Sequence, residues 1–157
     1  MEILLIAVGK TTTPYIAEGV DDYLKRLKHY LTFSMQCLRD VRKKGKLTPE
    51  RQKEEEGQTI LSQLQPSDFV MLLDENGIEV TSEGFAEMLQ KHMASGLKRM
   101  VFVIGGPYGF SPEVYARANK KLSLSRMTLS HEMVRLMFTE QVYRAMTILN
   151  GEPYHHR

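Results

Sequence analysis

The chain has 157 residues, 42% of them hydrophobic and 25% charged, which is typical of a soluble globular domain and excludes a low-complexity or fibrous protein. No apolar run approaches the roughly 20 residues of a membrane-spanning helix, and the apolar N-terminal stretch lacks the basic segment and cleavage site of a signal peptide. The net charge of +2 is too small to indicate a nucleic-acid partner by itself. We therefore expect a single domain over residues 1–157 and no membrane anchor.

The first elements alternate between strand and helix. A continuous apolar run at residues 3–8 predicts a buried strand. Thr13-Pro14 then supplies an N-cap and a proline at the first helical position, and apolar residues follow at helical spacing. Residues 33–41 predict a second strand, in which Cys37 is expected to be a buried thiol. Cys37 is the only cysteine, so no internal disulfide can form, which fits a cytoplasmic protein.

The alternation continues to the C-terminus. Thr48-Pro49 repeats the helix-start signal, and a charged helix runs toward Leu64, with its polar first half, residues 50–57, expected to be exposed. Residues 69–73 predict a third strand, which we expect to end before the turn pair Asn76-Gly77. The remaining predicted elements are a helix capped by Ser82, a strand at residues 100–104, a short helix after Ser111, a strand at residues 122–125 and a last helix after Ser130.

This order of elements predicts an α/β fold, with a mostly parallel sheet and helices on both faces. In such sheets, ligands bind beyond the carboxyl ends of the strands. That rule points to Leu73-Asp74, to the loop Gly105–Gly109 and to the segment that follows Leu124.

The loop Gly105-Gly106-Pro107-Tyr108-Gly109 is the most informative motif within these segments. Its two leading glycines let a ligand approach the backbone closely. The loop matches neither the G-x-G-x-x-G dinucleotide fingerprint nor the phosphate loop of nucleotide hydrolases. From this motif alone, ligand binding and a simple tight turn both stay open. Residues 124–129, taken alone, indicate only a strand-to-helix connection.

The C-terminal helix and tail concentrate polar groups. Arg144 follows Glu140 by four residues, so the two can pair on one helix face. Tyr154 and His155 follow in the tail, where aromatic, imidazole and guanidinium groups can stack on a base, contact phosphate or exchange a proton. Terminal residues are usually disordered, so a role for this tail is a hypothesis at this point.

Other chemistries have little support in the sequence. The pair His131-Glu132 lacks the second histidine of H-E-x-x-H and there is no cysteine cluster, so no metal site is predicted. No serine lies in a nucleophile elbow, so hydrolase chemistry is not indicated. The basic segment Arg39–Lys46 fits either a solvated loop or a contact with nucleic acid.

Taken together, these residues are similar to the ribosomal-RNA pseudouridine N3-methyltransferase family of the SPOUT class, also called the RlmH or YbeA family. The resemblance covers essentially the whole chain. Its landmarks are Ile6-Ala7-Val8-Gly9, Val103-Ile104-Gly105-Gly106-Pro107 with Gly109, Leu122-Ser123-Leu124-Ser125 with Met127-Thr128-Leu129 and His131, Arg135, Glu140 with Tyr143-Arg144-Ala145, and Pro153-Tyr154-His155. The family tail commonly continues directly with lysine or arginine, whereas here His156 precedes Arg157.

The resemblance implies a SPOUT-type fold with a C-terminal trefoil knot, S-adenosylmethionine as the cofactor, and a cytoplasmic homodimer whose substrate site draws on both subunits. It implies that the substrate is a pseudouridine of 23S ribosomal RNA in the assembled ribosome. The implied cofactor-binding residues are Leu73, Gly105, Leu124, Ser125, Arg126, Met127, Thr128 and Leu129.

For the chemistry, we predict that Tyr154 and His155 shape the target site and that His155 assists removal of the N3 proton. Arg135 and Arg144 are predicted to hold RNA or to stabilise negative charge on the base. No metal and no covalent nucleophile are required. Two other functions stay open from the residues alone: a non-catalytic ribosome-binding protein that uses Arg39–Lys46 and the tail, and a small nucleotide-binding oxidoreductase, which the missing dinucleotide fingerprint disfavours.

Overall fold

The computed structural model describes residues 1–41 and 47–156. Strands and helices alternate along these residues, as the sequence predicts. The elements are β1 (Glu2–Val8), α1 (Pro14–Leu27), β2 (Thr32–Leu38), α2 (Pro49–Ser62), β3 (Phe69–Glu79), α3 (Ser82–Ala94), β4 (Arg99–Ile104), α4 (Pro112–Arg117), β5 (Lys120–Ser123) and α5 (His131–Leu149).

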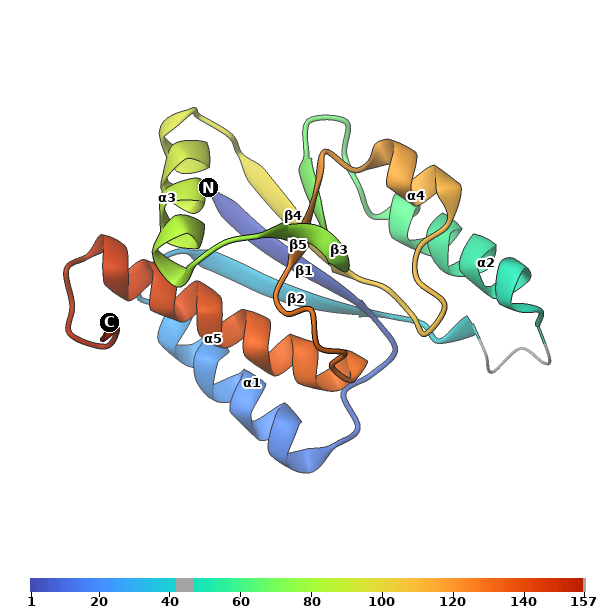
Figure 1. Ribbon diagram of the computed structural model, residues 1–157, viewed down its shortest axis with the longest axis horizontal. Helices are drawn as coiled ribbons and strands as arrows, with labels where there is room; N and C mark the ends of the chain where they lie inside the picture. The colour runs from blue at the N-terminus through green and yellow to red at the C-terminus, as the bar shows by residue number, and fades with distance from the viewer. Residues whose placement is uncertain (42–46, 157) are drawn as a thin grey trace.

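The strands form one five-stranded sheet in the order β2-β1-β4-β3-β5, and every pair of neighbouring strands is parallel. The sheet lies between two helical layers (Figure 1): α1, α3 and α5 cover one face, and α2 and α4 cover the other. Successive side chains of the central strands point to opposite faces of the sheet and pack against the two helical layers in turn. In β1, Ile3 and Leu5 pack toward α1, α3 and α5, whereas Leu4 and Ile6 pack toward α2 and α4. The predicted α/β class is confirmed.

Most helix starts follow the local sequence signals. The Thr48 hydroxyl accepts the backbone N–H of Arg51, and Ser130 caps α5 in the same way. The cap of α3 is Thr81, one residue before the predicted Ser82. Thr13 precedes α1 but makes no side-chain cap. The carboxylate of Glu132, in the first turn of α5, instead accepts hydrogen bonds from the chain just before α1.

Two strands differ from the prediction because the sheet, rather than the local pattern, sets their ends. β3 continues through Asn76-Gly77 to Glu79, with an irregular register against β5 between Leu73 and Ile78. β5 begins two residues earlier than predicted, at Lys120. The prediction of a buried Cys37 is wrong, since β2 is an edge strand and the Cys37 side chain is exposed.

The expected exposure of residues 50–57 is also wrong for one face of α2. Gln52, Glu56 and Gly57 are buried because this face packs beneath the glycine loop and against the start of α4. A Cβ atom on Gly106 would lie 2.5 Å from Oε1 of Glu56. The basic residues at 42–46 lie outside the described residues.

Within the described chain, no helix combines the length and apolar character needed to cross a membrane. The trefoil knot that the resemblance implies stays a prediction.

Candidate functional site

A cavity of about 580 Å³ opens at the carboxyl ends of the strands. It brings together the three segments that the topology rule singles out: the end of β3, the loop after β4 and the segment between β5 and α5. The lining residues are Leu73, Asp74, Glu75, Asn76, Ile104, Gly105, Gly106, Pro107, Tyr108, Gly109, Phe110, Tyr115, Leu124, Ser125, Met127, Thr128, Leu129, His131 and Val134.

The first two residues of the glycine loop have no room for a side chain. A Cβ on Gly105 would lie 3.0 Å from the ring of Phe110, and one on Gly106 would meet the Glu56 carboxylate. Gly109 has a φ of +81°, which L side chains rarely adopt, and its N–H donates to the carbonyl of Gly106 at 3.2 Å. The loop therefore presents its main chain to the cavity.

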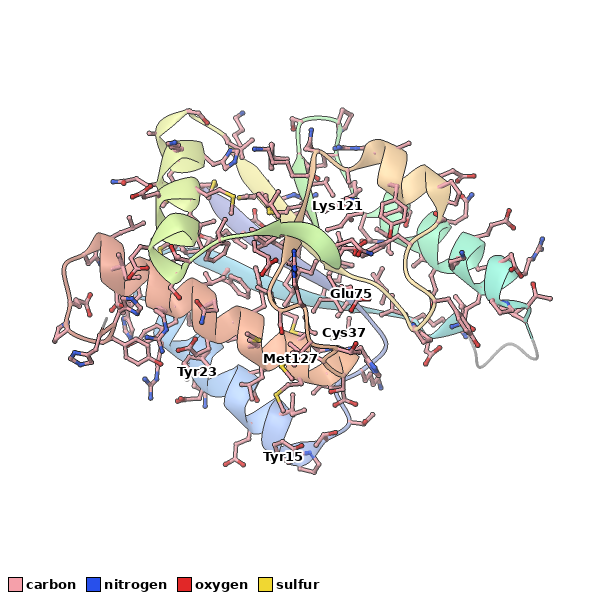
Figure 2. The ribbon with its side chains drawn as sticks, viewed as in Figure 1. Tyr15, Tyr23, Cys37, Glu75, Lys121 and Met127 are labelled. Carbon is pink, nitrogen blue, oxygen red and sulfur yellow. The ribbon has the colours of Figure 1, made fainter. Side chains whose placement is uncertain are left out.

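The segment before α5 closes the cavity from another side. Figure 2 shows Met127 in the same central region as Glu75, where this segment passes the end of β3. The Ser125 hydroxyl accepts the backbone N–H of Met127 at 2.9 Å, which fixes the turn. Arg126 is the one predicted cofactor residue that does not line the cavity: its side chain is 82% exposed and pairs with Glu79.

Sequence reasoning missed Tyr115, which comes from α4 and has no motif around it. Its hydroxyl donates to Oδ2 of Asp74 at 2.7 Å, and both residues line the cavity. Partial burial, together with this hydrogen bond, raises the pKa of Tyr115 to about 12. Tyr115 therefore stays protonated at neutral pH and acts here as a donor.

Arg135 is fully buried, at 0% exposed, on the inner face of α5. Its guanidinium donates to the backbone carbonyl of Val8 at 2.9 Å and to the Thr11 hydroxyl at 2.8 Å, and it lies 3.7 Å from the sulfur of Cys37. Burial lowers the pKa of Arg135. Its donors face the end of β1, and the role of Arg135 in holding RNA or stabilising negative charge on the base stays a prediction. A buried arginine at this position has no signal in helical spacing, which favours apolar residues there.

The C-terminal tail is docked on the helices rather than frayed. The Tyr154 hydroxyl donates to Oε1 of Glu140 at 3.0 Å and lies 3.4 Å from the hydroxyl of Tyr23. Arg144 pairs with Glu140 at 2.6 Å and stacks 4.8 Å from the centre of the Tyr154 ring. Burial, then these hydrogen bonds, raises the pKa of Tyr154 far above its ordinary value, so its hydroxyl stays a donor.

His155 is held at both of its ring nitrogens. Nδ1 lies 3.0 Å from Nη1 of Arg144, and Nε2 lies 2.8 Å from Oε1 of Glu83 on α3. Sequence reasoning missed Glu83, which is 72 residues away from His155. The following residue, His156, is exposed.

The cavity lies at the start of α5, whereas the docked tail lies against the second half of this helix. His131 and Val134, at the start of this helix, line the cavity, whereas the tail follows its last residue, Leu149. In Figure 1 the tail leaves the far end of α5 and turns back beside the helix. Glu140 and Arg144, which contact the tail, follow Val134 by six and ten residues, or roughly 9 and 15 Å along the helix at about 1.5 Å per residue. Within one chain, Tyr154 and His155 do not line the cavity in which most of the predicted cofactor residues lie.

No group of three or more histidine, cysteine, aspartate or glutamate side chains that could hold a metal gathers among the described residues.

Comparisons with a family model and with known proteins both indicate a methyltransferase family. The model of a family described as predicted SPOUT methyltransferase matches residues 1–155. A protein named ribosomal RNA large subunit methyltransferase H from Porphyromonas gingivalis is 56% identical over 156 residues, covering 99% of each chain. A protein of the same name from Christiangramia forsetii is 55% identical over 157 residues, covering 100% of each. With a family model that spans nearly all of its length, and with a backbone-walled cavity at the carboxyl ends of its parallel strands, the chain belongs to the SPOUT methyltransferase family.

Proposed function

We propose that this chain transfers a methyl group from S-adenosylmethionine to N3 of a pseudouridine in 23S ribosomal RNA of the assembled ribosome. The names of its relatives support large-subunit ribosomal RNA as the substrate. The resemblance to the RlmH family suggests the nucleotide and the assembled ribosome. The proposal includes a single cytoplasmic domain over residues 1–157, folded with the trefoil knot of that family.

One observation carries the proposal: the glycine loop and residues 124–129 meet in one cavity. Its volume of about 580 Å³ lies within the roughly 300–1,000 Å³ typical of small-molecule sites. Main-chain groups of Gly105 and of the segment 124–129 can hydrogen-bond a polar ligand, while Leu73 and Leu129 offer apolar walls. These residues fit S-adenosylmethionine, which when bound supplies a methyl group that is already electrophilic.

The separation of the two regions along α5 supports a homodimer. The docked tail holds Tyr154 against Glu140 and His155 against Arg144, and neither residue lines the cavity of its own chain. A second copy that brings its tail to this cavity completes the site. Tyr15, 65% exposed on α1, and Met127, 79% exposed at the cavity, are large apolar side chains that such a partner can cover.

In this composite site, the partner's tail provides the contacts to RNA. The Arg144 guanidinium can stabilise the negative charge that develops on the base as N3 loses its proton. The Tyr154 hydroxyl donates its one hydrogen to Glu140 in the docked tail, so it can donate to the nucleotide only by leaving that carboxylate. Proton removal by His155 requires its ring to leave one of its two contacts, because both nitrogens are engaged in the docked tail.

The test is to incubate the protein with radiolabelled S-adenosylmethionine and ribosomes from a strain that lacks its gene, and then to map the label. We expect label at N3 of one pseudouridine of the large-subunit RNA. Gly105→Trp should abolish cofactor binding by calorimetry, whereas Gln90→Trp, an equally bulky change on the exposed side of α3, should not. Tight ribosome binding without any transfer of label would instead favour the non-catalytic binding protein.

A further inference from the structure

Glu83 contacts His155 but has no role in the chemistry proposed above. Glu83 lies in the first turn of α3, and His155 lies near the end of the tail. Their side chains are 27% and 17% exposed, so the contact at 2.8 Å is partly shielded from water. The rest of the tail rests on α1 and α5, and Glu83 is what ties it to α3.

The two partners of His155 determine where its ring proton lies. A guanidinium only donates hydrogen bonds, so Nδ1, which faces Arg144, carries the lone pair. A carboxylate only accepts, so Nε2, which faces Glu83, carries the hydrogen. The ring is therefore the neutral Nε2–H tautomer, and the nitrogen that a general base would use is occupied by Arg144.

The same contacts form a chain that ends at the groups proposed to face the RNA. Glu83 accepts from His155, His155 accepts from Arg144, and Arg144 donates to Glu140, which also accepts from Tyr154. Each side chain in this chain of hydrogen bonds therefore depends on the donor or acceptor that its neighbour presents. A carboxylate at residue 83 thus fixes the tautomer, and the tautomer fixes the orientation of the Arg144 guanidinium.

We propose that Glu83 is a positioning residue for methyl transfer: it holds His155 as the Nε2–H tautomer and thereby aligns Arg144 and Tyr154 for the target nucleotide. This inference rests on the proposed function. It assigns His155 an orienting role in the docked tail in place of proton removal.

The first arm of the test reads the tautomer and needs no activity. In the ¹⁵N-labelled homodimer, with His155 assigned through His155→Gln, the imidazole proton should sit on Nε2 and exchange slowly enough to be observed. Glu83→Ala should lose this protected proton. Glu83→Gln should keep it, because the amide oxygen still accepts from Nε2. A proton on Nδ1, or a protected proton unchanged in Glu83→Ala, overturns the inference.

The second arm measures single-turnover methylation of ribosomes at saturating S-adenosylmethionine. We expect Glu83→Ala to lower the rate about 30-fold, the effect of losing one charge-assisted hydrogen bond. Cofactor affinity should not change, and the fall in the urea midpoint should be too small to unfold the variant under the assay conditions. Glu83→Gln should recover most of the rate. Glu87→Ala, which removes an exposed carboxylate one turn later on α3, is the matched control and should match the wild type.

The two arms separate the inference from the proposed function. A wild type that shows the protected Nε2 proton but transfers no methyl group refutes the proposed function, and with it the role of Glu83 in transfer. A wild type that methylates RNA while Glu83→Ala reacts at an undiminished rate refutes the positioning role alone. A fall in the urea midpoint of Glu83→Ala that accounts for its lost rate, with no rescue by Glu83→Gln, also refutes it.

Discussion

Nη2 of Arg135 lies 2.9 Å from the backbone carbonyl oxygen of Val8, the last residue of β1. This hydrogen bond joins α5 to the carboxyl edge of the sheet, close to the wall of the cavity that His131 forms. Arg135 thereby holds the start of α5 in place relative to β1. Its first contribution is structural.

Arg135→Ala should lower the free energy of unfolding by about 3 kcal/mol, because it opens a cavity and leaves the Val8 carbonyl without this donor. Arg126→Ala is the control: its side chain is 82% exposed, and a cost below about 0.5 kcal/mol is expected. Urea unfolding of the two variants measures both effects. Equal stabilities would contradict the packing described for Arg135.

Glu132 makes stability depend on acidic pH. Backbone hydrogen bonds from Thr13, then the side chain of Thr12, lower the pKa of Glu132 from 4.5 to about 2. The unfolded state binds the proton more tightly, so this stabilisation is present in full above pH 4.5 and is lost as the pH falls toward 2.

Glu132→Gln should therefore be less stable than the wild type near neutral pH, and the gap should close as the pH approaches 2. Urea unfolding at a series of pH values measures it. Glu87→Gln, which changes an exposed carboxylate, serves as the control and should show no such gap. A gap for Glu132→Gln that stays constant down to pH 2 would show that these hydrogen bonds do not favour the ionised carboxylate.

Gly106→Ala should disturb the glycine loop, because the new methyl group would lie 2.5 Å from Oε1 of Glu56. We expect at least a 10-fold loss of S-adenosylmethionine affinity, the result of a main-chain shift costing about 1.4 kcal/mol. Shortening the buried neighbour in the double variant Gly106→Ala/Glu56→Ala should recover part of it. Calorimetry decides: if Gly106→Ala binds the cofactor like the wild type, the loop does not form the wall of its site.

The parts of the fold that the sequence predicts well are those set by local patterns. The apolar run of β1 and the proline-led start of α1 occur where expected, since their signals need only neighbouring residues. Cys37 was misjudged because strand order, which is a property of the whole sheet, puts β2 at an edge. The buried face of α2 was misjudged because Glu56 is covered by a loop 50 residues further along the chain.

For the candidate site, too, local sequence signals predict some residues, whereas residues that depend on long-range contacts are missed. The glycine loop draws attention by composition, and the resemblance supplies Tyr154 and His155. Nothing in the pattern around Glu83 or Tyr115 marks them, since each acquires its contact only when distant segments come together. The burial of Arg135 is a further case, because arginine at a helix position normally indicates exposure.

The measurement that tests the central claim most directly is complementation within the dimer. Gly105→Trp disables the cavity and Arg144→Ala disables the tail, so each homodimer should be inactive toward ribosomes. Co-refolding the two should give about half heterodimers, each with one intact composite site, and therefore about a quarter of the wild-type methylation. Activity at that level, with heterodimers verified by native mass spectrometry, is the predicted result. Verified heterodimers that transfer no methyl group would contradict a site built from the cavity of one chain and the tail of the other.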